Sequence, residues 1–118
     1  MRKTILIVED DSRIRRIFTR LLVSEGYRVI AVVNAVSGYE VVKKNRVDLV
    51  LLDIKMPQVK GDVLFDAMQL FYGGIKVIVS SVYTLLEQKK LISGAFDYHD
   101  KSQGVDILLG KIERALKD

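Results

Sequence analysis

The chain has no cysteine and no long apolar run, and each absence excludes a class of protein. Without cysteine there can be no disulfide and no thiolate metal site, so we expect a cytoplasmic location. No apolar stretch approaches the roughly 18 to 20 residues that cross a bilayer. Acidic residues interrupt the N-terminal segment MRKTILIVEDD too early for a signal peptide. We therefore expect no association with a membrane.

The chain also lacks a concentrated basic segment, although its net charge is +4. Lysines and arginines are scattered from Arg2 to Lys117, without a long basic run and without aromatic residues between them. This distribution does not favour nucleic-acid binding. Arg13, Arg16 and Arg20 could share one face of a helix, which we interpret as a solvated face, with docking of a partner as the alternative.

The residues that are present suffice for one globular domain with a hydrophobic core. Of the 118 residues, 49% are apolar and 29% are charged, an ordinary balance for a globular protein. No repeat, linker or low-complexity segment divides the chain. We therefore expect a single domain over residues 1–118.

Five short apolar segments predict β-strands, at residues 3–8, 27–33, 47–53, 75–80 and 95–99. The segments are mostly continuous apolar runs rather than alternating ones. Continuous runs are typical of strands in a parallel sheet that helices cover on both faces.

A helix is predicted after each of the five strands. Apolar residues recur at helical spacing in three of these helices: Ile14, Ile17, Phe18, Leu21 and Leu22; Val63, Leu64, Ala67, Met68 and Phe71; and Val105, Leu108, Leu109, Ile112 and Leu116. Asn34 can begin the second helix, and Thr84 with Glu87 has the spacing of a capping box for the fourth. Gly26 can end the first helix as a left-handed cap, and Gly73–Gly74 can end the third.

Alternating strands and helices predict an α/β fold with a doubly wound, five-stranded parallel sheet and five helices. The right-handed crossover rule makes the strand order 2-1-3-4-5 a common solution. In such sheets the functional crevice lies beyond the carboxyl ends of the strands. The buried segment 47–53 would therefore carry Asp53 to that edge, four residues before Pro57, the single proline.

The residues expected at this edge are three acids, a hydroxyl and a cation. Glu9 and Asp10 follow the first strand, Asp53 ends the third, Ser81 follows the fourth and Lys101 follows the fifth. Three converging carboxylates repel one another, which favours a bound cation, and oxygen ligands suit Mg²⁺. The set is suited to bringing a phosphoryl group onto a carboxylate and holding it there.

Each acidic segment taken alone also has a simpler interpretation. The run at residues 9–11 could cap a helix, since carboxylates favour the positive end of the helix dipole, and we expect Asp11 or Ser12 to do so. Asp53 could be an ordinary turn residue. The occurrence of all the polar groups together, each at the end of its own strand, favours a functional site.

Four segments together resemble the receiver domain of two-component response regulators: ILIVEDDSRIRR, VDLVLLDIKMPQVKG, KVIVSSVY and GAFDYHDKS. The resemblance covers essentially the whole chain and implies a flavodoxin-like fold. It implies phosphoryl transfer from a phosphohistidine of a sensor histidine kinase or a histidine phosphotransfer protein. Such a domain is a signalling phosphoprotein rather than an enzyme, because it catalyses only its own phosphorylation and dephosphorylation.

The resemblance also implies a role for each residue of the site. Asp53 matches the phospho-accepting aspartate, and Lys101 matches the lysine of the family. Glu9 and Asp10 match the acidic pair that holds Mg²⁺, with Asp53 and the backbone carbonyl of Lys55 completing the protein ligands.

A second group of matching residues concerns the response to phosphorylation. Ser81 and Tyr98 match the two switch residues, and Lys55 and Tyr83 occupy positions at which we expect tuning of the phosphoryl lifetime. The output surface should comprise the helix from Thr84, the strand at 95–99 and the last helix, which could also form a homodimer. We expect no direct nucleic-acid binding and no output domain within this chain.

Three positions, Glu9, Lys76 and Ser102, depart from the pattern of the family. Glu9 replaces the commoner aspartate, and Lys76 stands where a proline often precedes the fourth strand. Ser102 replaces the proline that usually follows the lysine, and we predict a trans Lys101–Ser102 bond with the ammonium still in reach of Asp53. His99 is expected to be a surface residue without a role in phosphotransfer.

Three other functions fit the sequence less well than a phosphorylated receiver. A receiver-like module that is never phosphorylated would not need the complete acidic set. A flavodoxin would need a phosphate-binding loop rich in serine, threonine and glycine after the first strand, where this chain has acids. A phosphatase of the haloacid dehalogenase type would need a second aspartate two residues after the nucleophile, where Lys55 stands.

Overall fold

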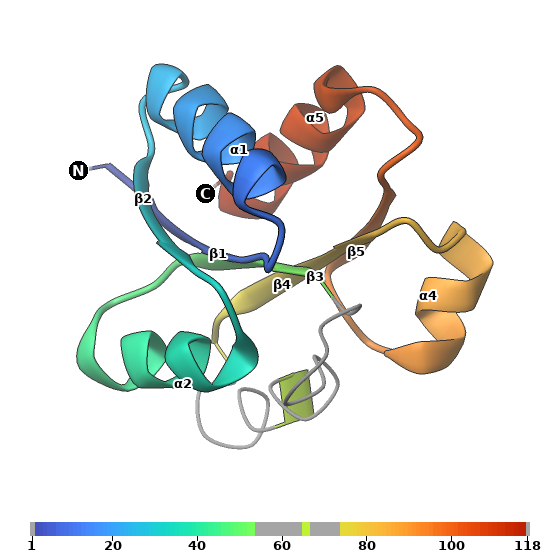
Figure 1. Ribbon diagram of the computed structural model, residues 1–118, viewed down its shortest axis with the longest axis horizontal. Helices are drawn as coiled ribbons and strands as arrows, with labels where there is room; N and C mark the ends of the chain where they lie inside the picture. Colours follow the sequence, from blue (N-terminus) through green and yellow to red (C-terminus); the bar gives the residue numbers. More distant parts are fainter. Residues whose placement is uncertain (1, 54–64, 67–73, 118) are drawn as a thin grey trace.

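The computed structural model describes residues 2–53, 65–66 and 74–117 (Figure 1). The structural findings that follow concern these residues. Several predictions lie outside them: the roles of Lys55, the position of Pro57, and most of the third helix, expected around residues 63–71.

Five parallel strands form one sheet with the order β2-β1-β3-β4-β5, as predicted (Figure 1). The strands are β1 (Thr4–Val8), β2 (Arg28–Val32), β3 (Leu49–Asp53), β4 (Lys76–Ser81) and β5 (Asp97–Asp100). Their bounds differ from the predicted ones by no more than two residues at either end. Every residue of β1 and β3 is buried, which explains why these central strands are apolar without alternation.

The described helices are α1 (Ser12–Ser24), α2 (Ala35–Lys44), α4 (Leu85–Leu91) and α5 (Val105–Leu116). Three of the predicted caps are present. Asn34 accepts a hydrogen bond from the backbone N–H of Ser37, and Thr84 and Glu87 form the capping box of α4. Gly26 has a φ of +94°, which fits its predicted role as a left-handed residue after α1.

Alternate strand residues face two hydrophobic clusters, one on each side of the sheet. One cluster joins the sheet to α1 and α5 and contains Ile5, Ile7, Phe18, Leu22, Leu49, Leu51, Ile78, Leu108, Ile112 and Ala115. The other joins it to α2 and α4, and its buried members are Leu6, Val8, Ala35, Val42, Val47, Val50, Leu52, Phe65, Val77, Val79, Ile92 and Tyr98. Helices therefore cover both faces of the sheet (Figure 1), an arrangement in which functional sites lie beyond the carboxyl ends of the strands.

Three sequence predictions about burial are wrong. The side chains of Ile17 and Val105 were assigned to buried helix faces, yet they are 56% and 43% exposed. In α1 and α5 the apolar stripe is wider than the face that meets the sheet. His99 was expected at the surface but is only 2% exposed, because β5 is covered on the side of α1 and α5 despite its polar sequence.

Lys76 has a structural role at the position where the family often has proline. Its Nζ donates a hydrogen bond to the carbonyl of Ala115 at 2.6 Å and lies 5.2 Å from the centre of the Phe96 ring. A cation at the C-terminal end of a helix is favourable, since free carbonyls concentrate partial negative charge there. Lys76 thereby ties the start of β4 to the last turn of α5.

Candidate functional site

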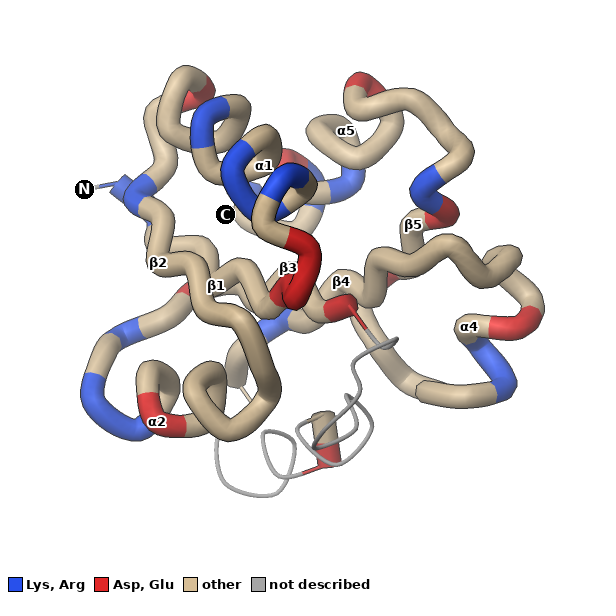
Figure 2. The backbone as a smooth tube through the Cα atoms, viewed as in Figure 1, with Lys and Arg blue, Asp and Glu red and all other residues tan. Residues whose placement is uncertain are grey.

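The carboxyl ends of the strands bring the predicted acidic residues together at one edge of the sheet. The carboxylate oxygens that Glu9, Asp10 and Asp53 offer all lie within 4.8 Å of one another. Glu9 and Asp53 are buried, whereas Asp10 is exposed. Figure 2 shows the acidic segment between β1 and α1 that supplies two of the three groups.

The arrangement of these oxygens fits a magnesium ion. Mg²⁺ prefers hard oxygen ligands, binds through one or two carboxylates and keeps several waters, for which the exposed side of Asp10 leaves room. The fourth predicted ligand, the carbonyl of Lys55, lies outside the described residues. Asp11 does not belong to this group, because its side chain accepts hydrogen bonds from the backbone N–H groups of Arg13 and Ile14 and caps α1.

Lys101 reaches across the site and binds two of its carboxylates. Its Nζ donates to Oε1 of Glu9 at 2.5 Å and to Oδ2 of Asp53 at 3.2 Å, with the lysine side chain 12% exposed. The ammonium therefore links residues from the ends of β1 and β3 through a loop that follows β5. Its distance to Asp53 agrees with the prediction made from the sequence.

The turn after β5 explains how Lys101 keeps this position with Ser102 in place of proline. The Lys101–Ser102 bond is trans, as predicted, like the other described peptide bonds. The backbone N–H and the hydroxyl of Ser102 both donate to one oxygen of Asp100 at 2.8 Å. The N–H of Lys101 donates to the carbonyl of Ser81 at 2.8 Å. Hydrogen bonds thus fix the backbone that a proline ring would otherwise restrict.

The crowding of buried charges shifts two pKa values. Burial, together with the hydrogen bond to Asp53, raises the pKa of Glu9 from 4.5 to about 7, although Lys101 opposes this change. For Lys101, burial acts to lower the pKa, but the hydrogen bond to Glu9 and the charge of Asp53 outweigh it and raise the pKa. The site without a metal therefore favours a proton on Glu9 and keeps Lys101 charged.

The two predicted switch residues are buried near the site. Ser81 is completely buried, and its Oγ accepts a hydrogen bond from the N–H of Tyr83 at 3.2 Å. Tyr98 is 8% exposed, and its hydroxyl donates to the carbonyl of Ile92 at 2.7 Å. The hydroxyl of Tyr98 therefore binds the C-cap residue that directly follows α4.

Sequence reasoning missed two polar residues that shape this region. The guanidinium of Arg15 donates to the carbonyl of Glu9 at 2.9 Å, and no sequence signal marks that contact. Gln88 is completely buried in α4, with its amide nitrogen 2.8 Å from two backbone carbonyls. Its position between Leu85 and Ile92, at helical spacing on the apolar side of α4, was the available signal.

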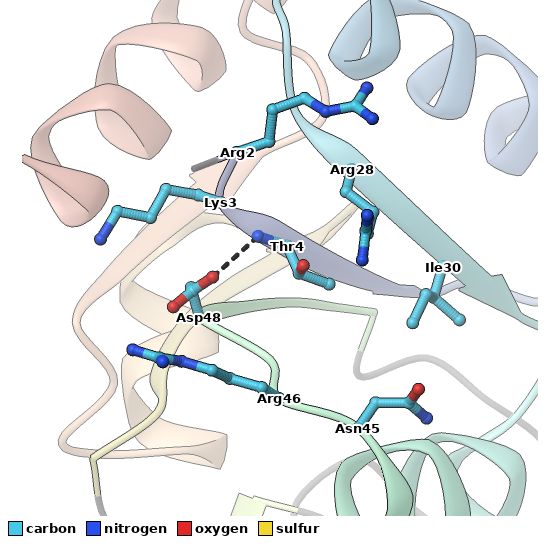
Figure 3. A pocket seen from close by; sticks show the side chains of 8 residues that line it. All are labelled: Arg2, Lys3, Thr4, Arg28, Ile30, Asn45, Arg46 and Asp48. Carbon is cyan, nitrogen blue, oxygen red and sulfur yellow. Dashed lines mark hydrogen bonds between the residues drawn. The ribbon is translucent and has the colours of Figure 1, made fainter.

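A cavity of about 350 Å³ lies at the opposite, amino-terminal edge of the sheet (Figure 3). Basic side chains gather around it, and its lining residues are Arg2, Lys3, Thr4, Arg28, Ile30, Asn45, Arg46 and Asp48. One oxygen of Asp48 accepts a hydrogen bond from the N–H of Thr4 at 2.8 Å. The two edges of the sheet therefore differ in charge, with acids at the carboxyl end and mainly basic groups at the amino end (Figure 2).

Comparison with known proteins identifies the family to which this site belongs. A family model described as the response regulator receiver domain matches residues 5–113. The chain belongs to the response regulator receiver family. This receiver domain has the parallel sheet and the acidic edge that the sequence predicted, and receiver domains are phosphorylated on an aspartate.

Curated relatives and solved structures agree with this assignment. The chain is 30% identical to the sporulation initiation phosphotransferase F of Bacillus subtilis, over 98% of this chain and 95% of that protein. It is 32% identical to a CheY-like receiver domain protein from Methanospirillum hungatei, with a TM-score of 0.89 over 97% of this chain and 93% of the other. The response regulator TrrA of Thermotoga maritima, solved in complex with Mg²⁺ and BeF, is 26% identical, with a TM-score of 0.86 over 97% of this chain and 99% of that one.

Other relatives are much longer than this chain. It is 29% identical to the transcriptional regulatory protein GlrR of Escherichia coli, and the match covers 96% of this chain but 26% of the relative.

Within the described residues, every helix is too short or too polar to cross a membrane.

The different positions of Asp10 and Asp11 generate a first prediction. Asp10→Asn should weaken Mg²⁺ binding by about tenfold or more, because it removes a charged ligand. Asp11→Asn is the matched control, since asparagine also caps helices, and it should change the affinity by less than about twofold. Isothermal titration with Mg²⁺ measures both constants. Equal losses in the two variants would contradict the assignment of Asp10 as the ligand.

The raised pKa of Glu9 generates a second prediction. With a chelator present, the folded domain keeps Glu9 protonated over a pH range in which the unfolded chain has lost that proton. Stability due to this group is therefore complete below pH 4.5 and is lost as the pH rises to about 7. The loss should be on the order of 3 kcal/mol.

Urea unfolding at a series of pH values, with and without Glu9→Gln, isolates this contribution. The difference in unfolding free energy between wild type and variant should change across this pH range without Mg²⁺. A pH-independent difference would show that Glu9 has an ordinary pKa.

Proposed function

We propose that Asp53 is the residue on which this receiver domain is phosphorylated. The observation that carries the proposal is the position of its carboxylate, buried at the end of β3 and hydrogen-bonded to Lys101. A carboxylate oxygen of Asp53 attacks the phosphorus of a phosphohistidine, and the bond from phosphorus to the imidazole nitrogen breaks. The product is an acyl phosphate on Asp53 and a free histidine on the donor.

Glu9, Asp10 and Asp53 would hold Mg²⁺, together with the carbonyl of Lys55. When bound, the ion neutralises negative charge on the phosphoryl oxygens. Lys101 supplies a second positive charge beside Asp53 and can move its hydrogen bond from the carboxylate to a phosphoryl oxygen. Glu9 must lose its proton as the ion binds, since carboxylate ligands bind in the ionised form.

The donor is proposed to be a sensor histidine kinase or a histidine phosphotransfer protein. Its histidine must approach Asp53 at the carboxyl edge, beside α1 and the loop after β5. Two exposed apolar side chains, those of Ile17 and Val105, are available for contact there. Arg13, Arg16 and Arg20 are also exposed on α1 and could meet an acidic partner.

Phosphorylation is proposed to change the surface formed by α4, β5 and α5. Ser81 would leave the N–H of Tyr83 and donate its hydroxyl to the phosphoryl group, and Tyr98 would move into the space that opens. Exposed apolar side chains on this side include Leu86 and Leu91 of α4. They favour docking of a target or of a second copy of the domain.

The remaining features of the proposal concern the whole chain. Residues 1–118 form one receiver domain, located in the cytoplasm. Its catalysis is confined to its own phosphorylation and to hydrolysis of its own acyl phosphate. It makes no direct contact with nucleic acid.

The phosphorylation site is tested with a small acyl phosphate donor and Mg²⁺. The wild-type domain should gain the mass of one phosphoryl group, and Asp53→Asn should gain none, because an amide is not a nucleophile here. Asp48→Asn, at the opposite edge of the sheet, is the control and should be labelled like the wild type. Intact-protein mass spectrometry measures each product, and equal labelling of Asp53→Asn would refute the site.

Tyr83 and Lys55 are proposed to lengthen the life of the acyl phosphate. Both lie two residues beyond a functional residue, and a bulky aromatic and a long cation there can hinder an attacking water. Tyr83→Ala should therefore shorten the phosphoryl half-life by about threefold or more, on the order of 0.7 kcal/mol in barrier. Tyr39→Ala, in α2, is the control, and an unchanged half-life for Tyr83→Ala would remove Tyr83 from this role.

A further inference from the structure

Gln88 is a fully buried polar residue in α4 whose amide nitrogen uses both of its hydrogens. It donates to the carbonyl of Tyr83 and to the carbonyl of His99, each at 2.8 Å. Both neighbours are carbonyl oxygens, so only the NH₂ end of the amide can face them. The other end, Oε1, has no hydrogen-bond partner among the described residues. Burying an amide with one end unpaired is unfavourable, which points to a role beyond filling space.

The two bonds of Gln88 connect the surroundings of both switch residues. Tyr83 is held at its N–H by Oγ of Ser81 and at its carbonyl by Gln88. His99 follows Tyr98 directly in β5, and its side chain is on the opposite side of the strand. A continuous path of hydrogen bonds and backbone therefore runs from Ser81 through Gln88 to Tyr98.

Gln88 and Tyr98 also hold two different parts of α4, its middle and its C-terminal end. Gln88 fastens the middle of the helix to the loop before it and to β5, while the hydroxyl of Tyr98 binds the carbonyl of Ile92 at its end. Tyr98 is additionally linked to Ala95, whose N–H donates to its hydroxyl at 3.2 Å. Movement of Ser81 away from Tyr83 would disturb the hydrogen bond between Gln88 and Tyr83. Movement of Tyr98 would break the hydrogen bond between its hydroxyl and Ile92.

We propose that Gln88 is a positioning residue that holds α4 in the arrangement of the unphosphorylated domain and couples Ser81 to Tyr98. Ser81 can turn toward Asp53 only by withdrawing its oxygen from the N–H of Tyr83, a residue that Gln88 anchors. The side-chain amide of Gln88 therefore favours the arrangement of the unphosphorylated domain. Removing this amide raises the fraction of molecules that are competent to bind a phosphoryl group. This inference rests on the function proposed for Asp53.

Gln88→Met is the variant that tests the coupling. Methionine has a similar length and an unbranched, apolar side chain, but it donates no hydrogen bond. The probe is beryllofluoride, a mimic of the phosphoryl group, titrated in saturating Mg²⁺ and followed by fluorescence or NMR. The variant should bind beryllofluoride about threefold or more tightly than the wild type, because the apparent dissociation constant falls as the competent fraction rises. Its affinity for Mg²⁺ alone should stay within about twofold, since the acidic ligands are on other elements.

A matched control separates coupling from general loss of stability. Val42→Ala removes part of a buried side chain of α2, in the hydrophobic cluster that joins the sheet to α2 and α4. It should lower stability without changing beryllofluoride affinity. If Gln88 only supports the fold, Gln88→Met will behave like this control or bind beryllofluoride more weakly, and the proposal is then wrong. If Gln88→Met does not fold, Gln88→Asn, which keeps the amide but is too short for both carbonyls, is judged by the same criteria.

The outcome for the wild type distinguishes this inference from the proposed function. Failure of the wild-type domain to bind beryllofluoride in Mg²⁺ would contradict the function assigned to Asp53. Normal binding by the wild type, with no gain in Gln88→Met, would contradict only the coupling through Gln88.

Discussion

A single ammonium group lies between two buried carboxylates at the edge of the sheet, and the chemistry of the site depends on the negative charge that it leaves uncompensated. Lys101 contacts Glu9 and Asp53, which come from the ends of β1 and β3. Two buried acids with one cation leave an excess of negative charge, which either a proton on Glu9 or a metal ion can relieve. The same imbalance favours binding of Mg²⁺, which the proposed phosphorylation of Asp53 would require.

The charged edge stands on buried strands, whereas the neighbouring α4 is attached in part by side-chain hydrogen bonds. β1 and β3 are buried along their whole length between helices on both faces, so Glu9 and Asp53 have fixed positions. α4 is short, and polar contacts made by Gln88 and Tyr98 attach it to β5 and the adjoining loops. Under the proposed coupling, rearrangement of these hydrogen bonds would move α4 without disturbing the sheet.

Much of this architecture could be predicted from the sequence, because continuous apolar strands, helix caps and acids at strand ends are local signals. Asp53 and Lys101 could be placed at one edge, since the carboxyl ends of parallel strands meet there. The burial of His99 could not be predicted, because it depends on which elements cover β5 rather than on the local pattern. For Gln88 the helical spacing from Leu85 to Ile92 places it on the apolar side of α4, but its polar character conceals its burial. The hydrogen bond of Lys76 to the end of α5 joins residues 39 positions apart and leaves no trace in sequence spacing.

The most direct test of this account is a crystal structure of the domain with Mg²⁺ and beryllofluoride. We expect beryllium bonded to a carboxylate oxygen of Asp53, with Lys101 donating to a fluorine and Mg²⁺ held by the acidic residues of the same edge. We also expect that the hydroxyl of Ser81 faces the beryllofluoride and no longer accepts from Tyr83. Beryllofluoride attached to another carboxylate, or Lys101 turned out to solvent in that complex, would contradict this account.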